Sequence, residues 1–167
     1  MKLFFVRHAE ALDRSAVMAD EMRYLTSEGR GSFRKTARTM LKQGCKPSLI
    51  LTSPLIRAVQ TAEIFAETLA FIGPLLVRNE LRPGFDMQKL QELLNEFQSA
   101  DEVVLVGHEP DLSGLITALL SLPDGLDLKK GAAVKLKTDP KNLQNSSVFK
   151  WLAAGKKLVR ECKEISG

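Results

Sequence analysis

Four short runs along the chain are dense in leucine, isoleucine, valine and phenylalanine. They lack a clear alternation of apolar and polar positions, which is typical of strands that are buried on both faces of a sheet. We therefore predict buried strands at residues 2–6, 49–52, 75–78 and 103–106.

The segments between these runs repeat their apolar residues at three- and four-residue spacing, which is typical of amphipathic helices. The clearest pattern runs over residues 55–69. At the start of this helix, Ser53 is expected to be the N-cap and Pro54 to occupy the first position. Thr26 is expected to cap an earlier helix. The predicted helices cover about residues 26–41, 55–69, 87–97 and 111–120.

This alternation of strands and helices predicts an α/β fold, with a mostly parallel central sheet flanked by helices on both faces. Near the C-terminus, residues 133–138 alternate apolar and lysine side chains, and a turn-rich stretch at 139–142 leads into residues 147–152. We predict antiparallel strands here, at the edge of the sheet. No repeat or linker divides the chain, so we expect a single domain over residues 1–167.

The composition is that of an ordinary globular protein, with 44% hydrophobic and 26% charged residues. Cys45 and Cys162 lie far apart and form no cluster with histidine, so we expect reduced thiols and no zinc site. The apolar N-terminus meets Arg7 too soon for a signal peptide, and no apolar run approaches a membrane-spanning length. We expect a cytoplasmic protein that binds no membrane.

Positive charge is concentrated near the C-terminus. Residues 129–163 contain ten basic and two acidic residues, whereas the whole chain has a net charge of +4. Such a segment could contact an acidic partner or nucleic acid. It lacks the aromatic interleaving and the motifs of nucleic-acid-binding modules, so we expect a solvated face and no nucleic-acid partner.

The chain has only two histidines, and each follows a predicted buried strand. His8 comes after the first strand and His108 after the fourth. In open parallel sheets, ligands bind beyond the carboxyl ends of the strands. If these two strands are neighbours, both imidazoles lie at the same edge, which favours a functional site over two structural histidines.

Arginine is the second residue type at this edge. Arg57 falls in the first turn of the helix after the second strand, where a cation opposes the helix dipole. This position favours a role in anion binding, assisted by the free N–H groups of the turn. The alternative is that Arg57 only pairs with a surface carboxylate. Arg7, beside His8, adds another guanidinium.

Two histidines and two arginines at one edge favour phosphoryl transfer. Guanidinium groups match phosphate oxygens in shape and charge. A neutral imidazole can attack phosphorus and carry the group as phosphohistidine, which water then hydrolyses. Two histidines without a convincing third ligand do not predict a metal site, so we expect no metal and no other cofactor.

Four segments resemble motifs of the histidine phosphatase superfamily, the phosphoglycerate mutase-like proteins. Residues 7–10 resemble its first signature, residues 52–62 its second motif, residues 106–108 its third, and residues 25–29 the stretch that opens its first helix. The matches occur in the family's order, and the short chain is similar to the SixA-type phosphohistidine phosphatases. The resemblance implies a compact phosphoglycerate mutase-like fold without a lid subdomain.

The resemblance also implies roles for individual residues. His8 would be the nucleophile that becomes phosphorylated. Arg7, Arg57 and His108 would bind the phosphoryl oxygens around it and stabilise the transition state.

The family usually has, in addition, a carboxylic acid that protonates the leaving group. Glu80 follows the third predicted strand and is the best positional match. Glu10 and Glu109 are weaker candidates.

The leading hypothesis is a metal-independent phosphatase that hydrolyses phosphohistidine on a protein, such as a phosphotransfer domain of a signalling relay. The motifs follow one another too closely for a lid, and an open pocket would admit phosphate displayed on another protein. A small-molecule phosphomonoesterase with the same site is the first alternative. A catalytically silent phosphate-binding or adaptor module is the second. The sequence leaves the oligomeric state open.

Overall fold

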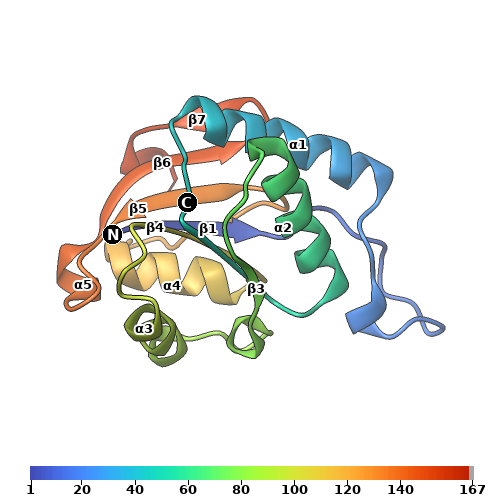
Figure 1. The fold of residues 1–167 in the computed structure, drawn as a ribbon, viewed down its shortest axis with the longest axis horizontal. Helices are drawn as coiled ribbons and strands as arrows, with labels where there is room; N and C mark the ends of the chain where they lie inside the picture. The colour runs from blue at the N-terminus through green and yellow to red at the C-terminus, as the bar shows by residue number, and fades with distance from the viewer. Residues whose placement is uncertain (166–167) are drawn as a thin grey trace.

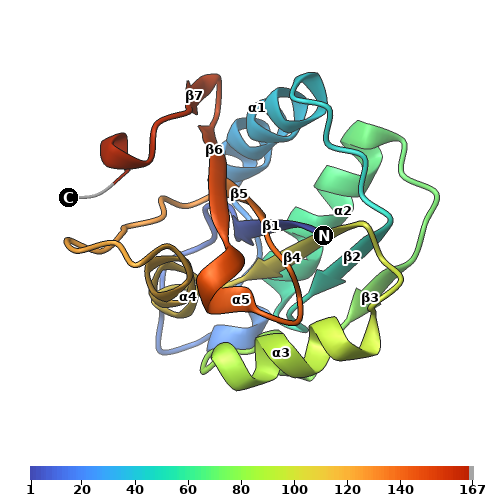
Figure 2. The same ribbon diagram turned by 90° about the vertical axis from the view of Figure 1, so that its left-hand side faces the viewer.

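The computed structural model describes residues 1–165, which form a seven-stranded sheet between two layers of helices (Figure 1, Figure 2). The strand order is β3-β2-β4-β1-β5-β6-β7. The first four strands in this order are parallel, so the predicted α/β class is confirmed. Their bounds are β1 Lys2–Arg7, β2 Leu49–Thr52, β3 Leu75–Val77 and β4 Glu102–Gly107.

The C-terminal part of the sheet is antiparallel. Strand β5 (Ala133–Lys137) pairs with β1 and with β6 (Val148–Ala154), and β7 (Lys157–Val159) pairs with β6. The two predicted antiparallel strands are confirmed, but their predicted place at the sheet edge is wrong. The edge on this side of the sheet is β7, because Gly155, with a φ of +59°, permits a tight turn that folds the chain back onto β6.

Helices cover both faces of the sheet, as predicted (Figure 2). One face carries α1 (Ser27–Lys42) and α2 (Ile56–Leu69), and the other carries α3 (Met87–Glu96), α4 (Asp111–Leu120) and the short α5 (Leu143–Ser146). Between β2 and β4 the described chain holds α2, β3 and α3 with short connections. It contains no inserted lid subdomain, as expected.

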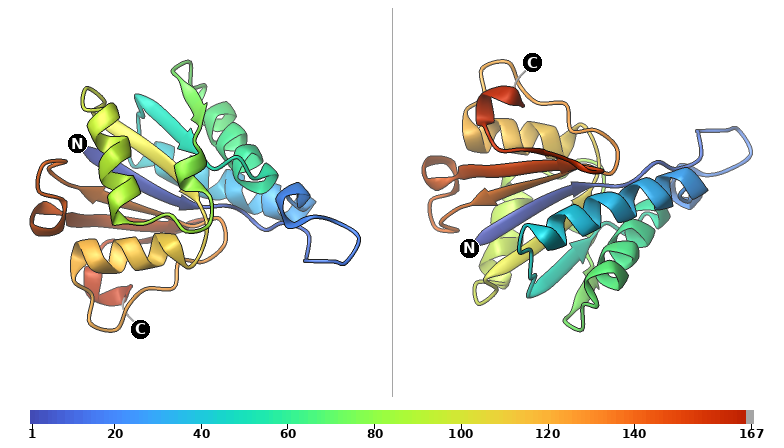
Figure 3. Two further views of the ribbon diagram at one scale, coloured as in Figure 1. Left: turned by 90° about the horizontal axis from the view of Figure 1, so that it is seen from below. Right: turned by 90° about the horizontal axis from the view of Figure 1, so that it is seen from above.

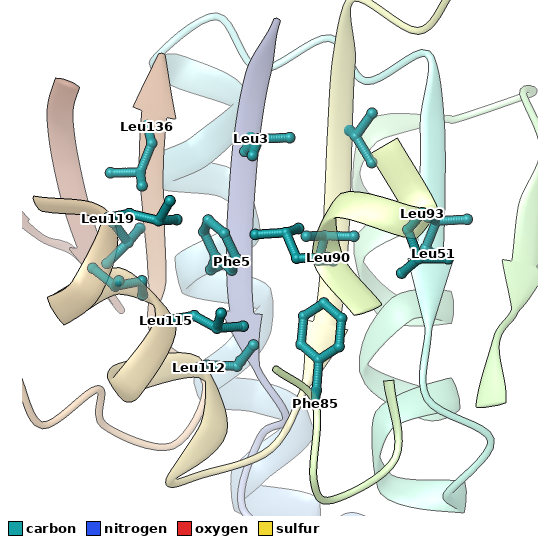
Figure 4. Close-up of a cluster of buried hydrophobic side chains, with 14 of the residues drawn as sticks. Leu3, Phe5, Leu51, Phe85, Leu90, Leu93, Leu112, Leu115, Leu119 and Leu136 are labelled. Carbon is teal, nitrogen blue, oxygen red and sulfur yellow. The ribbon is translucent and has the colours of Figure 1, made fainter. Parts of the chain in front are cut away.

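Successive residues of β1 point to opposite faces, and both faces are packed. Leu3 and Phe5 belong to a cluster that includes leucine side chains of α3 and α4 (Figure 4). Phe4 and Val6 belong to the opposite cluster, with side chains of α1 and α2. All four residues are fully buried, which explains why this apolar run shows no alternation.

The start of α1 is held against the loop that follows β1. Thr26 caps the helix, as predicted, by accepting a hydrogen bond from the N–H of Gly29 at 2.9 Å. A Cβ atom on Gly29 would lie 2.2 Å from the carbonyl oxygen of Glu10. Glycine is therefore needed at this position, because the helix and the loop approach too closely for any side chain.

The predicted cap of α2 is wrong. The helix begins at Ile56, and Leu55 is its N-cap without a side-chain hydrogen bond. Oγ of Ser53 instead accepts a hydrogen bond from the N–H of Leu55 at 3.3 Å and lies 2.7 Å from Nε2 of His108. The hydroxyl that was expected to cap the helix therefore belongs to the site described below.

Candidate active site

Two neighbouring parallel strands bring the histidines together. β1 and β4 pair with Arg7 opposite Gly107, so His8 and His108 leave the same end of the sheet. Their ring centroids are 5.2 Å apart. The residues are 8% and 4% exposed, respectively. The structure thus confirms the predicted convergence, which depended on these two strands being adjacent.

The backbone determines which nitrogen of His8 carries the proton. Nδ1 lies 2.7 Å from the carbonyl oxygen of Ala9, and a carbonyl oxygen can only accept a hydrogen bond. In the neutral ring Nδ1 is therefore protonated and Nε2 has a lone pair. Nε2 accepts a hydrogen bond from Nε of Arg57 at 3.3 Å. His8 thus presents an unprotonated nitrogen to this arginine.

Burial keeps both imidazoles neutral. It lowers the pKa of His8 to about 4, with a further contribution from the charges of Arg57 and Arg7. Burial also lowers the pKa of His108 to about 3, and the neighbouring His8 adds to this effect. At neutral pH, Nε2 of His8 is therefore free to act as a nucleophile.

Arg57 lies in the first turn of α2, as predicted, and is buried. Besides its bond to His8, its Nη1 donates to the backbone oxygen of Asp20 at 2.7 Å, and its Nη2 donates to Oδ2 of Asp20 at 2.9 Å. The pairing with a carboxylate, which was the alternative interpretation of Arg57, is therefore confirmed, and the role in anion binding stays a prediction. The guanidinium pairs with a carboxylate, and it also faces the nitrogen that can attack phosphorus.

Two further charged residues, Asp20 and Arg23, belong to the site and were not expected there. They lie in the segment between β1 and α1, which extends beyond the body of the sheet (Figure 3). Oδ1 of Asp20 accepts a hydrogen bond from Nη1 of Arg23 at 2.7 Å, and Nε of Arg23 donates to the carbonyl of Leu12 at 2.6 Å. This segment has no hydrophobic periodicity, so its path could not be predicted from the sequence.

Two buried nitrogens of the site lack hydrogen-bond partners. Nη1 of Arg7 donates to the carbonyl of Leu128 at 2.7 Å, but its buried Nε has no partner among residues 1–165. The buried Nδ1 of His108 also has no partner within that range. Such atoms are uncommon in folded proteins, and a catalytic role or a bound ligand frequently accounts for them.

Within the described part of the chain, Glu80 makes no hydrogen bond to the four motif residues, which are Arg7, His8, Arg57 and His108. It lies in the 3₁₀ turn Asn79–Leu81, and its carboxylate accepts hydrogen bonds from Arg78 at 2.8 and 3.3 Å. These bonds lower the pKa of Glu80. A proton donor in catalysis requires the opposite shift. The protein without substrate therefore holds Glu80 as a carboxylate paired with Arg78.

The two weaker candidate acids have different surroundings. Oε1 of Glu10 lies 3.5 Å from Nζ of Lys130 in an exposed ion pair. Glu109 directly follows His108, and burial raises the pKa of this carboxyl. Its Oε1 is buried and has no partner among the residues that the structure describes. In contrast to Glu80, Glu109 is therefore in an environment that favours the protonated form of its carboxyl.

The described residues contain no group of three or more histidine, cysteine or acidic side chains that could hold a metal ion. None of their helices combines the length and the apolar character needed to cross a membrane. Cys45 and Cys162 are both free thiols.

Comparison with known proteins shows the family. The sequence profile of the histidine phosphatase superfamily (branch 1) matches residues 3–85. The phosphohistidine phosphatase SixA of Escherichia coli is 31% identical over 123 residues, which are 71% of this chain and 74% of that protein. The chain belongs to the histidine phosphatase superfamily. This histidine phosphatase is therefore an enzyme whose reaction requires no metal ion.

The whole fold agrees with this membership. The structure of the protein histidine phosphatase SixA complexed with tungstate superposes with a TM-score of 0.78 and 27% identity, over 93% of this chain and 97% of that one. An uncharacterised protein of Picosynechococcus is 36% identical over 149 residues, which are 86% of this chain and 89% of that protein. Phosphatases named for small phosphate esters share the fold at lower identity, so the fold alone does not define the substrate of this histidine phosphatase.

Proposed function

We propose that this enzyme hydrolyses phosphohistidine on a protein through a phosphorylated intermediate on His8. The observation that carries the proposal is the fixed tautomer of His8. Its Nδ1–H is bound by the carbonyl of Ala9, so the lone pair of Nε2 points to Arg57. A nucleophile held beside a guanidinium is the arrangement that phosphoryl transfer to a histidine requires.

The reaction has two steps. Nε2 of His8 attacks the phosphorus atom and forms a P–N bond, while the P–N bond to the substrate imidazole breaks and that imidazole takes up a proton from the solvent. Water then attacks the phosphorus of the intermediate, one proton of that water is released to the solvent, the bond to Nε2 of His8 breaks, and inorganic phosphate leaves. Both steps transfer the phosphoryl group in line, so positioning and charge stabilisation supply most of the catalysis.

The unpartnered nitrogens support a phosphate pocket around His8. A phosphoryl oxygen would supply an acceptor for the buried Nε of Arg7, and another would do so for Nδ1 of His108 when that nitrogen carries the proton. The bond of 3.3 Å between Arg57 and His8 is long, so an arriving phosphoryl group can replace it with shorter bonds. We propose Arg7, His8, Arg57 and His108 as the phosphate-binding residues.

The state of Glu80 favours an imidazole leaving group. An alkoxide leaves poorly without a proton donor, and Glu80 is held as a carboxylate by Arg78. An imidazole depends less on this help, so the arrangement suits phosphohistidine better than an alkyl phosphate. For alkyl phosphates we still propose Glu80 as the general acid. It must then be protonated before it can act, although the charge of Arg78 stabilises its ionised form.

The surroundings of the site support a protein substrate. The segment between β1 and α1 carries three exposed apolar side chains, with Val17 96%, Met22 56% and Tyr24 46% exposed. The same segment contributes Asp20 to the site and projects from the body of the molecule (Figure 3). Exposed apolar side chains beside a site are typical of protein–protein contact. A phosphotransfer domain in the cytoplasm is the partner that we propose.

The alternatives are a small phosphate ester as substrate and a silent phosphate-binding module. The test compares hydrolysis of a phosphohistidine-labelled protein with that of aryl and alkyl phosphates, for the wild type and for His8→Ala. We expect saturation at low concentration with the labelled protein only, and no hydrolysis by His8→Ala. Saturation with an ester only would show that the substrate is a small phosphate ester and not a protein. Binding of phosphate without hydrolysis of any substrate would indicate the silent phosphate-binding module.

A further inference from the structure

The carboxylate of Asp20 contacts three arginines, Arg57, Arg23 and the exposed Arg14, whose Nε donates to Oδ1 at 3.2 Å. Its Oδ2 accepts a hydrogen bond from Arg57 at 2.9 Å, and its Oδ1 accepts one from Arg23 at 2.7 Å. The side chains of Arg57 and Arg23 are only 5% and 12% exposed, whereas that of Asp20 is 38% exposed. A carboxylate that is hydrogen-bonded to a phosphate-binding arginine can affect phosphate binding in two opposite ways. It can compete with phosphate for the guanidinium, or it can hold the guanidinium in place for phosphate.

The atoms involved favour the second effect. Asp20 occupies the outer end of the guanidinium, because Nη1 donates to its backbone oxygen and Nη2 to its carboxylate. Nε of Arg57 donates to Nε2 of His8. Asp20 therefore takes no donor on the side that faces the nucleophile, and there a phosphoryl oxygen can replace the long bond to Nε2 of His8. A competing carboxylate would instead occupy the side that faces His8.

The charge balance agrees with this assignment. One carboxylate cannot neutralise Arg57, Arg23 and Arg14, so the cluster keeps a net positive charge beside His8. Hydrogen bonds from Arg23 and Arg57 hold the pKa of Asp20 well below its ordinary value. The carboxylate is therefore ionised throughout the neutral range. Arg23 is itself fixed by the carbonyl of Leu12, so the pair is anchored to the backbone.

We propose that Asp20 is a positioning residue, which holds the guanidinium of Arg57 against His8 so that it can receive the phosphoryl group. Arg23 in turn holds Asp20. The inference rests on the proposed function, because it takes Arg57 as a phosphate ligand. It assigns a role in catalysis to the segment between β1 and α1, beyond the four motif residues.

The test measures binding of inorganic phosphate and steady-state hydrolysis for Asp20→Ala and Asp20→Asn. For Asp20→Ala we expect phosphate affinity and kcat each to fall by about 10- to 100-fold, which is the effect of losing a charge-assisted hydrogen bond. The amide oxygen of Asp20→Asn can still accept one hydrogen bond, so this variant should recover part of both losses. A purely structural role would lower the stability but would not give this graded recovery of phosphate affinity.

Glu21→Ala is the matched control. Glu21 is the next residue of the same 3₁₀ turn, but its carboxylate pairs with the exposed Arg82 at 2.6 Å. All variants are compared at a temperature at which their circular dichroism spectra show them folded. We expect Glu21→Ala to match the wild type in phosphate affinity.

Tighter phosphate binding by Asp20→Ala would show that the carboxylate competes with phosphate, and it would overturn the proposal. Unchanged affinity would overturn it as well. Failure of the proposed function is a separate outcome. If the wild type hydrolyses no phosphohistidine while Asp20→Ala still loses phosphate affinity, the substrate assignment fails and the positioning role stands.

Discussion

Nε of Arg57 and Nε2 of His8 are 3.3 Å apart in the folded protein, although the two residues are 49 positions apart in the sequence. The contact joins a strand end to a helix start. It places a cation directly beside the nitrogen that we propose to attack phosphorus, and at the same time it lowers the pKa of that nitrogen's ring. The same geometry therefore prepares the nucleophile and the group that stabilises the transferred phosphate.

The buried histidines predict a strong dependence of stability on pH. Burial lowers the pKa of His8 to about 4 and that of His108 to about 3, whereas both regain about 6.5 on unfolding. Between these values the unfolded chain binds more protons, so the free energy of unfolding falls as pH decreases from about 6.5 towards 4. We expect a slope of up to about 1.4 kcal/mol per pH unit for each histidine.

Urea unfolding at a series of pH values measures this slope. Replacement of both histidines by glutamine should flatten the profile in the same pH range. A wild-type stability that stays constant from pH 6.5 to 4.5 would contradict the neutral, buried state of the pair.

Two glycines of α1, Gly29 and Gly31, form a matched pair that tests how closely this helix approaches the backbone of Glu10. A Cβ atom on Gly29 would lie 2.2 Å from the carbonyl oxygen of Glu10, whereas one on Gly31 would have no atom within 4 Å. Gly29→Ala should lower the free energy of unfolding by about 1–3 kcal/mol, because backbone atoms must move. Gly31→Ala should raise it by about 0.5–1 kcal/mol through helix propensity. Equal effects in chemical denaturation would show that the approach at Gly29 is not tight.

Glu80→Gln tests whether Glu80 protonates the leaving group. General acid help contributes about 10²–10⁴-fold where it is needed. We therefore expect this variant to lose more activity on an alkyl phosphate than on phosphohistidine, whose imidazole leaves with less help. The measurement compares kcat on phosphohistidine, phenyl phosphate and an alkyl phosphate. Equal losses on all three substrates would exclude Glu80 as the acid, and Glu109 would then be the carboxyl to replace.

The exposed apolar side chains of the segment between β1 and α1 should matter for a protein substrate only. Val17→Ser should raise the KM for the phosphohistidine protein by up to about tenfold, because it removes an apolar contact. Its KM for an aryl phosphate should stay close to the wild-type value. Ile72→Ser is the control, since Ile72 is fully exposed but follows the C-terminal end of α2, away from Arg57. If both variants change the KM for the protein equally, the segment between β1 and α1 is not its docking surface.

Most of the sheet could be predicted because its central strands are buried on both faces. That burial produces apolar runs such as the one that contains Phe4 and Phe5, and such runs are easy to recognise. The edge strand β7 lacks this signal, since only Val159 of its residues is buried, and the sequence left it unassigned. The opposite edge strand, β3, was predicted from its apolar residues, but its predicted burial is wrong, because Leu76 and Val77 are exposed. Apolar composition, rather than burial itself, therefore determined which of the parallel strands could be recognised.

The site could be predicted only where a residue sits at the end of a regular element. His8, His108 and Arg57 do so, and the structure brings them together. Asp20 lies in an irregular segment, and its contact with Arg57 depends on how that segment folds over α2. Ser53 shows the reverse case, because a good capping residue is used by His108 instead. Predictions from local sequence preferences, such as helix capping, therefore fail where a side chain makes its hydrogen bond to a residue of the site and not to its own helix or strand.

The most direct test of the account is to trap the phosphorylated enzyme. The wild type is mixed with a ³²P-labelled phosphohistidine protein, quenched in alkali within milliseconds, and digested for mass spectrometry. We predict an acid-labile, alkali-stable phosphoryl group on the peptide that contains His8, and none in His8→Ala. Label on another residue, or full hydrolysis by His8→Ala, would contradict the central claim that Nε2 of His8 takes the phosphoryl group.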